Sequence, residues 1–338
     1  MAVFIDPPYE DYYGDRLFDI SDARLNRDDS LLPYHRLREQ LSARGMSVRT
    51  ADFLLREQGL AETNHYYSLG LLDNYERLKQ RKDVLLRAFV VFEPPVVRPR
   101  LYRALPALTA AFEEVYVHNT SGEGYSLEGV DRSRLRKLYW PQPRDDVIAR
   151  WWSNRDRLQR VVAISGNHVP RSFKQELYSK RIQAMVALDR LGVIDLYGLG
   201  WNQWWSRNSM WPPYWLNYRK LMSIYRGPCA SKYEILGSYE FSLCLENMAM
   251  KGYLTEKLFD CLYAGTIPLY LGASDIADLV PGDALVDCRQ FASWEETWRY
   301  AKALPPSRRQ SMREAGRDFI RSSAGLRYFD SLPMLFLH

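Results

Sequence analysis

Short apolar runs and longer amphipathic stretches alternate along the chain, which is typical of proteins in which strands and helices alternate. Each apolar run ends at a polar or proline-containing segment, so the runs predict buried strands. The expected strands are Val3–Ile5, Met46–Thr50, Val84–Phe92, Glu114–His118, Val161–Ile164, Val193–Tyr197, Tyr239–Leu245, Ile267–Leu271 and Ala284–Val286. Helical spacing is present over Leu32–Ala43, Leu105–Phe112, Gln175–Leu191, Leu258–Leu262 and Trp294–Ala303. This order predicts α/β layers.

The segment from Trp140 to Arg160 separates two such halves, because it is rich in proline, charge and tryptophan. A length of 338 residues also fits two domains of about 150 residues each. We expect an N-terminal domain over residues 1–150, a second domain over residues 158–315, and a tail over residues 316–338 that packs back on the domains. Two α/β halves joined by a linker suggest two facing Rossmann-like domains.

Composition narrows the function classes. With 46% hydrophobic and 26% charged residues the chain is neither disordered nor collagen-like. A net charge of +5 is too small for a nucleic-acid binder with a basic arm, but it suits an anionic substrate or loose contact with an acidic membrane surface. The sequence shows no signal peptide and no apolar run of about 18 residues, so no integral membrane segment is expected.

Cysteine and histidine usage gives no indication of a metal or redox site. None of the four cysteines forms a C-x-x-C pair, and no two histidines have the spacing of a metal-binding helix. His118 and His168 could each be a base, but a single histidine near a loop is usually a polar surface residue, which is what we expect for both. We therefore expect a cytoplasmic protein without a cofactor, with peripheral contact at the inner membrane allowed.

The polar segment with most chemistry follows the strand Tyr239–Leu245. Thr255 can cap a helix there, and the carboxylate of Glu256 suits its first turn. Lys257 does not suit it, since a cation at a helix N-terminus is disfavoured unless an anion intervenes. Lys257 either extends to solvent or binds a phosphate at the helix end. With Tyr253 available to stack on a base and Glu256 to accept from ribose hydroxyls, we favour a nucleoside diphosphate site.

Two further strand ends carry candidate residues. The strand Val161–Ile164 leads into a loop that contains Asn167, and Arg181 lies close to the same strand end. Glu93 follows another strand and precedes two prolines, so it is either an ordinary turn carboxylate or a rigidly placed general base. The Gly-x-Gly at Gly198 lacks the third glycine of a dinucleotide fingerprint, and no Walker motif is present.

A tryptophan-rich segment has two open interpretations. It contains Trp201, Trp204, Trp205, Trp211 and Trp215. These side chains either stack on sugars of an acceptor or pack an irregular loop against the core.

The stretch from residue 241 to residue 272 resembles the α1,3/4-fucosyltransferase family, which is glycosyltransferase family 10. The family signature is roughly F-x-L-x-x-E-N, then Y-[VI]-T-E-K, then G-[TV]-[IV]-P-[VI]-x-x-G. The corresponding segments here are Phe241-Ser242-Leu243-Cys244-Leu245-Glu246-Asn247, Tyr253-Leu254-Thr255-Glu256-Lys257 and Gly265-Thr266-Ile267-Pro268-Leu269-Tyr270-Leu271-Gly272. Arg181 is placed like the pyrophosphate-binding arginine of the family, and Phe92-Glu93-Pro94-Pro95 resembles its F-E-S-P, whose glutamate is the proposed base.

The resemblance implies a bacterial-type, soluble member with a GT-B fold, in which two Rossmann-like domains face each other across a cleft. It also implies an inverting transfer of a sugar, L-fucose from GDP-L-fucose, to a hydroxyl of a carbohydrate acceptor. Glu93 is then the catalytic base, and the donor-binding residues are Arg181, Asn247, Tyr253, Glu256 and Lys257, with Glu246, Thr255 and Asn167 as further candidates. The sequence has no Asp-x-Asp motif, so no metal is required. The alternatives are a same-fold transferase for another nucleotide sugar and a non-catalytic sugar- or nucleotide-binding protein.

Overall fold

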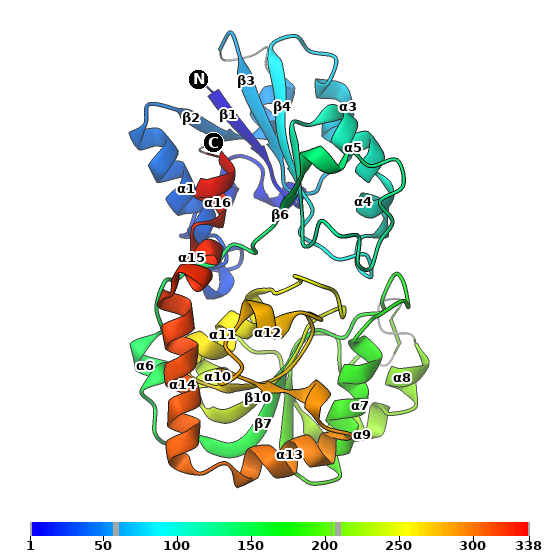
Figure 1. The fold of residues 1–338 in the computed structure, drawn as a ribbon, viewed down its shortest axis with the longest axis vertical. Coiled ribbons are helices and arrows are strands. Elements are labelled where there is room, and N and C mark those ends of the chain that lie inside the picture. Colours follow the sequence, from blue (N-terminus) through cyan, green and yellow to red (C-terminus); the bar gives the residue numbers. More distant parts are fainter. Residues whose placement is uncertain (1, 57–60, 204, 207–210, 337–338) are drawn as a thin grey trace. The chain divides into compact units, whose positions relative to one another are not determined.

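The structure is a computed structural model that describes residues 2–56, 61–203, 205–206 and 211–336. The chain forms two compact units (Figure 1). Unit 1 comprises Met1–Pro143 and Arg327–His338, and unit 2 comprises Arg144–Leu326. Residues 144–150, which the sequence assigns to the first domain, therefore belong to unit 2, and residues 327–338 of the expected tail belong to unit 1.

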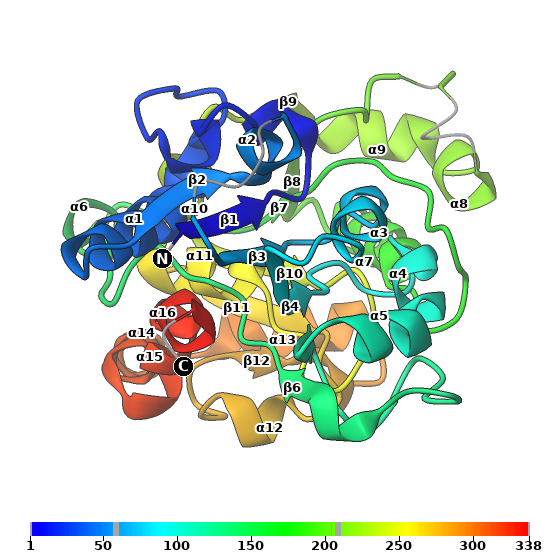
Figure 2. The same cartoon turned by 90° about the horizontal axis from the view of Figure 1, so that it is seen from above.

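Unit 1 is built on a six-stranded sheet with the strand order β2-β1-β3-β4-β5-β6. Figure 2 labels β2, β1, β3, β4 and β6 of this sheet. Every pair of neighbouring strands is parallel. The strands are β1 (Ala2–Asp6), β2 (Ser47–Thr50), β3 (Asn64–Ser68), β4 (Val84–Val90), β5 (Glu114–Val117) and β6 (Leu135–Lys137).

Neighbouring residues of these strands enter opposite hydrophobic clusters, because side chains alternate across a strand. Phe4 and Tyr66 belong to one cluster, whereas Ile5 and Tyr67 belong to the other. The first cluster also takes residues from α2 (Ala51–Arg56), α3 (Asp73–Leu78), α4 (Pro99–Arg103) and α5 (Leu105–Ala111). The second takes residues from α1 (Leu32–Ala43) and α16 (Ser331–Phe336). The C-terminal helix thus completes one face of the sheet of unit 1.

Unit 2 is built on a second parallel sheet, with the strand order β12-β11-β10-β7-β8-β9. Its strands are β7 (Leu158–Ile164), β8 (Ile194–Tyr197), β9 (Tyr225–Gly227), β10 (Tyr239–Leu245), β11 (Ile267–Leu271) and β12 (Val286–Asp287). Every residue of β10 is buried, as expected for a strand with both faces covered.

Two groups of helices supply this cover in unit 2 (Figure 1). In the first, α7 (Tyr178–Asp189) contacts α8 (Pro212–Trp215), α9 (Tyr218–Ile224) and α13 (Trp294–Ala303). In the second, α11 (Glu256–Ala264) contacts α6 (Ala149–Trp152), α10 (Lys232–Gly237) and α14 (Pro306–Arg321). The short helix α12 (Ile276–Leu279) follows β11, and α15 (Ser323–Phe329) contains the boundary between the units.

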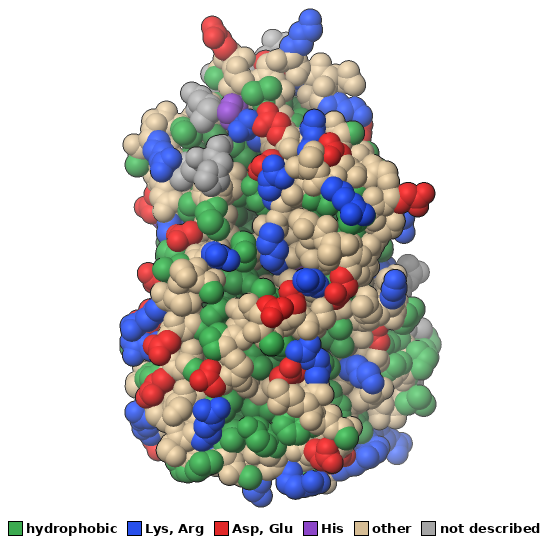
Figure 3. Space-filling view, in the orientation of Figure 1, with side chains coloured by type: hydrophobic (Ala, Val, Ile, Leu, Met, Phe, Trp, Pro, Cys, Tyr) green, Lys and Arg blue, Asp and Glu red, His purple; other side chains and the backbone are tan. Residues whose placement is uncertain are grey.

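The surface charges, the cysteines and the helix lengths can be described in turn. On the face shown in Figure 3, basic and acidic side chains are interspersed. All four cysteines are buried and free. Among the helices in the described part of the chain, none combines the length and the apolar character needed to cross a bilayer.

Candidate functional site

The strand order of unit 2 reverses between β7 and β10, because β8 and β9 lie on one side of β7 while β10, β11 and β12 lie on the other. Ligands of open α/β sheets bind beyond the carboxyl ends of the strands at such a switch point. Glu246 and Asn247 directly follow β10, and the loop that contains Asn167 follows β7. Sequence-predicted residues therefore meet at the topologically favoured place in this unit.

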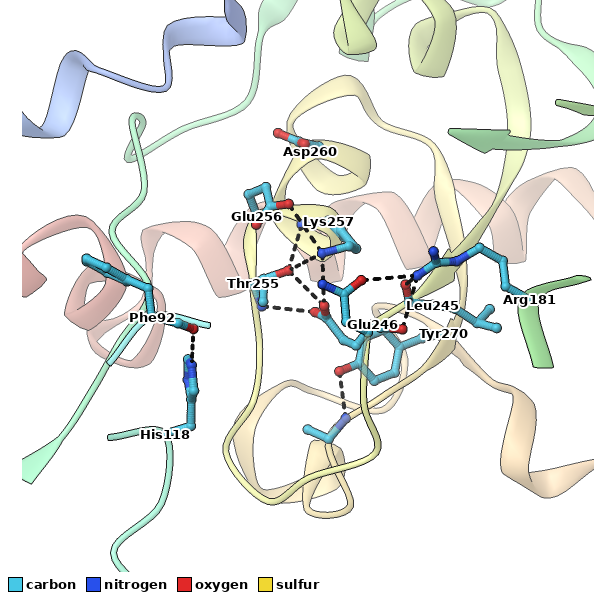
Figure 4. A network of polar contacts seen from close by, with 12 residues as sticks. Phe92, His118, Arg181, Leu245, Glu246, Thr255, Glu256, Lys257, Asp260 and Tyr270 are labelled. Carbon is cyan, nitrogen blue, oxygen red and sulfur yellow. Dashed lines mark hydrogen bonds and ion pairs between the residues drawn. The ribbon is translucent and has the colours of Figure 1, made fainter. Parts of the chain in front are cut away.

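Glu246 is the centre of a network at this edge, drawn in Figure 4. Its carboxylate is fully buried and accepts hydrogen bonds from the backbone N–H (2.9 Å) and the hydroxyl (2.8 Å) of Thr255. The Nζ of Lys257 lies 3.3 Å from Glu246 Oε2 and 3.3 Å from Glu256 Oε1. Thr255 is the N-cap of α11, since its Oγ1 accepts from the backbone N–H of Lys257. One buried carboxylate thus orients the first turn of the helix.

Burial sets the electrostatics of this network. Desolvation raises the pKa of Glu246, although Lys257 partly offsets the effect. Burial also acts to raise the pKa of Glu256, but Lys257 and Lys232 outweigh it and hold that pKa below its usual range. The sequence analysis expected an anion beside Lys257, and in the structure the carboxylates of Glu246 and Glu256 occupy that position. A diphosphate would compete with these carboxylates for the ammonium group.

The end of the family signature is explained by the packing around Glu246. A Cβ atom on Gly272 would lie 2.5 Å from the Cγ of Glu246 and 2.4 Å from the hydroxyl of Tyr270. Only glycine leaves room for the buried carboxylate at this point. The same Tyr270 hydroxyl accepts from the backbone N–H of Ala273, which fixes the turn after β11.

Arg181 lies in the first turns of α7 and is only 5% exposed. Its Nη2 donates to the carbonyl oxygens of Leu245 (2.9 Å) and Glu246 (3.1 Å) and lies 3.4 Å from Asn247 Oδ1. Burial lowers the pKa of Arg181. Arg181 therefore holds the loop after β10, a structural role that the sequence did not predict, and all of these contacts use one guanidinium nitrogen.

Two other predicted donor residues differ in accessibility. Asn247 is half-buried, and its carbonyl accepts from the backbone N–H of Leu177. Tyr253 is 1% exposed, so neither face of its ring is open to a base in this structure. The stacking role expected for Tyr253 is therefore wrong for the structure as it stands. The apolar neighbours of Tyr253 in the sequence, Leu254 and Met250, are equally buried.

Asn167 lines a cavity of about 450 Å³ beside the ends of β7, β8 and β9. Its backbone N–H and its Nδ2 donate to the carbonyls of Leu199 and Gly200. Its Oδ1 is buried without a hydrogen-bond partner among the described residues. Gly198 permits this close approach of the two loops, because a Cβ there would lie 1.9 Å from the carbonyl oxygen of Ser165.

In the tryptophan-rich segment, some side chains pack in the core and others are exposed, as stacking on an acceptor sugar would need. Trp201 and Trp211 are buried, and the Nε1 of Trp201 donates to the carbonyl of Ser165 at 2.6 Å. Trp205 is 68% exposed and lies parallel to Trp215 with 6.3 Å between the ring centroids. Trp204 lies outside the described residues.

In unit 1, Glu93 follows β4 in a turn and is half-buried. Tyr102 of α4 is buried, and its pKa is raised by desolvation, with a contribution from the charge of Glu93. His118 follows β5 and is 1% exposed, so its assignment to the surface is wrong.

Comparison with known proteins finds a family model that matches part of unit 2. Residues 169–313 match the family described as Glycosyltransferase family 10 (fucosyltransferase) C-term. Relatives include the alpha-(1,4)-fucosyltransferase of Arabidopsis thaliana, 42% identical over 69 residues, and the alpha-(1,3)-fucosyltransferase FucT of Helicobacter pylori, 36% identical over 74 residues. The matches cover 20% and 22% of this chain but only 17% and 16% of the relatives' lengths.

A solved structure of an alpha1,3-fucosyltransferase matches over 100% of this chain and 89% of its own, with a TM-score of 0.53 and 14% identity. Two parallel α/β sheets and this likeness define the fold as that of GT-B glycosyltransferases. The match to glycosyltransferase family 10 is confined to residues 169–313, all of which lie in unit 2.

Proposed function

We propose that the chain is an inverting glycosyltransferase that transfers L-fucose from GDP-L-fucose to a hydroxyl of a carbohydrate or glycoconjugate. The observation that carries the proposal is the network of Glu246, Thr255 and Lys257 at the switch point of unit 2. It places a helix N-terminus and an ammonium group together inside the segment that matches family 10. Both features bind phosphate groups.

The donor is assigned to unit 2. In the proposal Lys257, Arg181 and the N–H groups at the start of α11 hold the diphosphate, while Glu256 accepts from the ribose hydroxyls. Arg181 supports this assignment because the hydrogen bonds that its side chain makes to described residues all use Nη2. In the proposal, Asn247 and Asn167 also contact the sugar nucleotide. The buried Oδ1 of Asn167 can accept a hydrogen bond from an N–H or O–H group of that nucleotide.

The reaction is assigned as follows. The carboxylate of Glu93 takes the proton of an acceptor hydroxyl, and the acceptor oxygen attacks the anomeric carbon. The bond from that carbon to the diphosphate breaks, its electron pair goes to the leaving GDP, and the configuration inverts. Lys257, Arg181 and the end of α11 stabilise the charge that grows on the diphosphate. We propose that no metal ion is required, so turnover should persist in EDTA.

Calorimetry with GDP, UDP and dTDP tests the donor site. Selective binding of GDP supports the proposal, and Lys257→Ala should weaken it, with the exposed Lys302 of α13 changed to alanine as the matched control. Unchanged affinity in Lys257→Ala removes Lys257 from the diphosphate site. Preference for UDP or dTDP leaves the reaction class and discards fucose, and no binding at all favours a non-catalytic role.

Turnover of GDP-L-fucose with a panel of sugar acceptors tests the base. Glu93→Gln should lower kcat by about 10²–10⁴-fold while leaving GDP affinity intact. A near-normal rate would show that Glu93 is not the base. Cell fractionation tests the accompanying proposal that the protein is cytoplasmic, with peripheral contact at the inner membrane.

A further inference from the structure

A buried histidine in unit 1 contacts the residue next to Glu93. The Nε2 of His118 lies 2.6 Å from the carbonyl oxygen of Phe92 (Figure 4). A carbonyl oxygen can only accept, so Nε2 carries the proton and donates. This contact fixes the tautomer of His118 and gives the carbonyl of Phe92 a partner inside the protein.

The contact continues the pairing of two strands beyond their ends. Strands β4 and β5 pair in parallel, with Ala88 opposite Glu114 and Val90 opposite Tyr116. Phe92 and His118 follow in the same register, since they are also separated by 26 positions. The imidazole therefore holds the chain after β4 at the point where the backbone ladder has ended.

The ring of His118 is itself fixed in place. The indole of Trp140 lies nearly parallel to it, with an interplanar angle of 12° and 6.2 Å between centroids, and also contacts the ring of Phe92 at 5.4 Å. Lys137 donates from Nζ to the carbonyl of His118. Burial, assisted by the charge of Lys137, lowers the pKa of His118 to about 3. The imidazole is thus neutral near pH 7.

We propose that His118 is a positioning residue for Glu93. The carbonyl of Phe92 belongs to the same planar peptide group as the backbone nitrogen of Glu93, so holding that oxygen fixes the plane from which the Glu93 side chain starts. On the other side, Pro94 and Pro95 restrict the backbone by their rings. Glu93 is therefore held from both directions. This inference rests on the proposed function, in which Glu93 is the base.

The test compares variants that keep or lose the donor at the Nε2 position. His118→Phe keeps an aromatic ring against Trp140 and loses the donor. His118→Gln places an amide N–H near the same point, whereas His118→Asn is too short to reach the carbonyl. His35 supplies a matched control, because its Nδ1 contacts the carbonyl of Phe18 at 2.8 Å elsewhere in unit 1.

We expect His118→Phe and His118→Asn to lower kcat by about 10–100-fold, since small misplacements of a catalytic group cost that much, with GDP affinity unchanged. His118→Gln should recover most of the rate. His35→Phe should keep the wild-type kcat. In the Glu93→Gln background, His118→Phe should cause no further loss, because its effect passes through Glu93.

Three results would overturn the inference: a kcat in His118→Phe that equals that of His35→Phe, a failure of His118→Gln to exceed His118→Asn, or a further tenfold loss in the double variant. If His118→Phe does not fold, the comparison of His118→Gln with His118→Asn decides. A near-normal rate in Glu93→Gln would instead reject the base of the proposed function, which is a separate outcome.

Discussion

Replacement of Thr255 by valine removes one hydroxyl from the centre of the unit 2 network and keeps the shape of the side chain. That hydroxyl donates to Glu246 Oε2 at 2.8 Å, and both residues are fully buried. A hydrogen bond to a charged group contributes about 1.5–3 kcal/mol to stability. The cap to the N–H of Lys257 is long, at 3.4 Å, and adds about 0.5 kcal/mol, the low end for an N-cap.

We therefore expect Thr255→Val to lower the free energy of unfolding of unit 2 by about 2–3.5 kcal/mol. At about 2–4 °C per kcal/mol for a domain of this size, the melting temperature should fall by about 4–14 °C. GDP affinity should fall as well, because Glu246 and Lys257 lose the hydroxyl that joins them.

Thermal unfolding followed by circular dichroism measures the first effect, and calorimetry the second. Thr255→Ser is the matched control, since it keeps the hydroxyl and loses only a methyl group, which contributes about 1 kcal/mol when buried. If Thr255→Val is as stable as Thr255→Ser, the hydroxyl does not stabilise the helix start, and the reasoning about the network is refuted.

Two further predictions concern packing and pH. Gly272→Ala places a Cβ 2.5 Å from the Cγ of Glu246 and should destabilise unit 2 by about 1–3 kcal/mol while weakening GDP binding; a melting temperature equal to that of the wild type would contradict this. Burial opposes ionisation of Asp146, yet hydrogen bonds from Arg321 and Arg317 lower its pKa to about 2. A lowered carboxyl pKa contributes stability above the unfolded value of 3.8 that is lost as the pH falls through about 2. Because Asp146 is 38% exposed, we expect no more than about 1 kcal/mol from it. In urea unfolding measured at a series of pH values, the free energy of unfolding of Asp146→Asn should fall less steeply than that of the wild type between about pH 3.8 and about pH 2. An equal fall in both proteins would show that Arg317 and Arg321 do not stabilise the charged form of Asp146.

The strands inside mainly apolar runs were readable from the sequence. Tyr239–Leu245 and Ile267–Leu271 occur with the predicted bounds, because a strand covered on both faces is mostly apolar, although Glu240 and Ser242 are polar residues within the first of them. Strands β3, β6 and β9 were missed. Their sequences, NHYYS, LRK and YRG, are short and polar, and only pairing with a neighbouring strand makes them extended.

In the candidate site, too, some features could be predicted from the sequence and others depended on tertiary contacts. The sequence by itself determined the residue types and their spacing: the cap at Thr255, the acid at Glu256, the cation at Lys257 and the carboxylate before two prolines at Glu93. These are local properties of adjacent residues, and helix capping and dipole arguments apply to them directly.

Only the tertiary structure decided which of these groups meet and which are accessible. It buried Glu246 beneath Lys257, closed the ring of Tyr253 to solvent, directed Arg181 onto the backbone after β10 and placed His118 against Phe92. Each of these outcomes depends on contacts between residues far apart in the chain. Burial and hydrogen-bond partners are set by the packing of whole elements, so no pattern of neighbouring residues determines them.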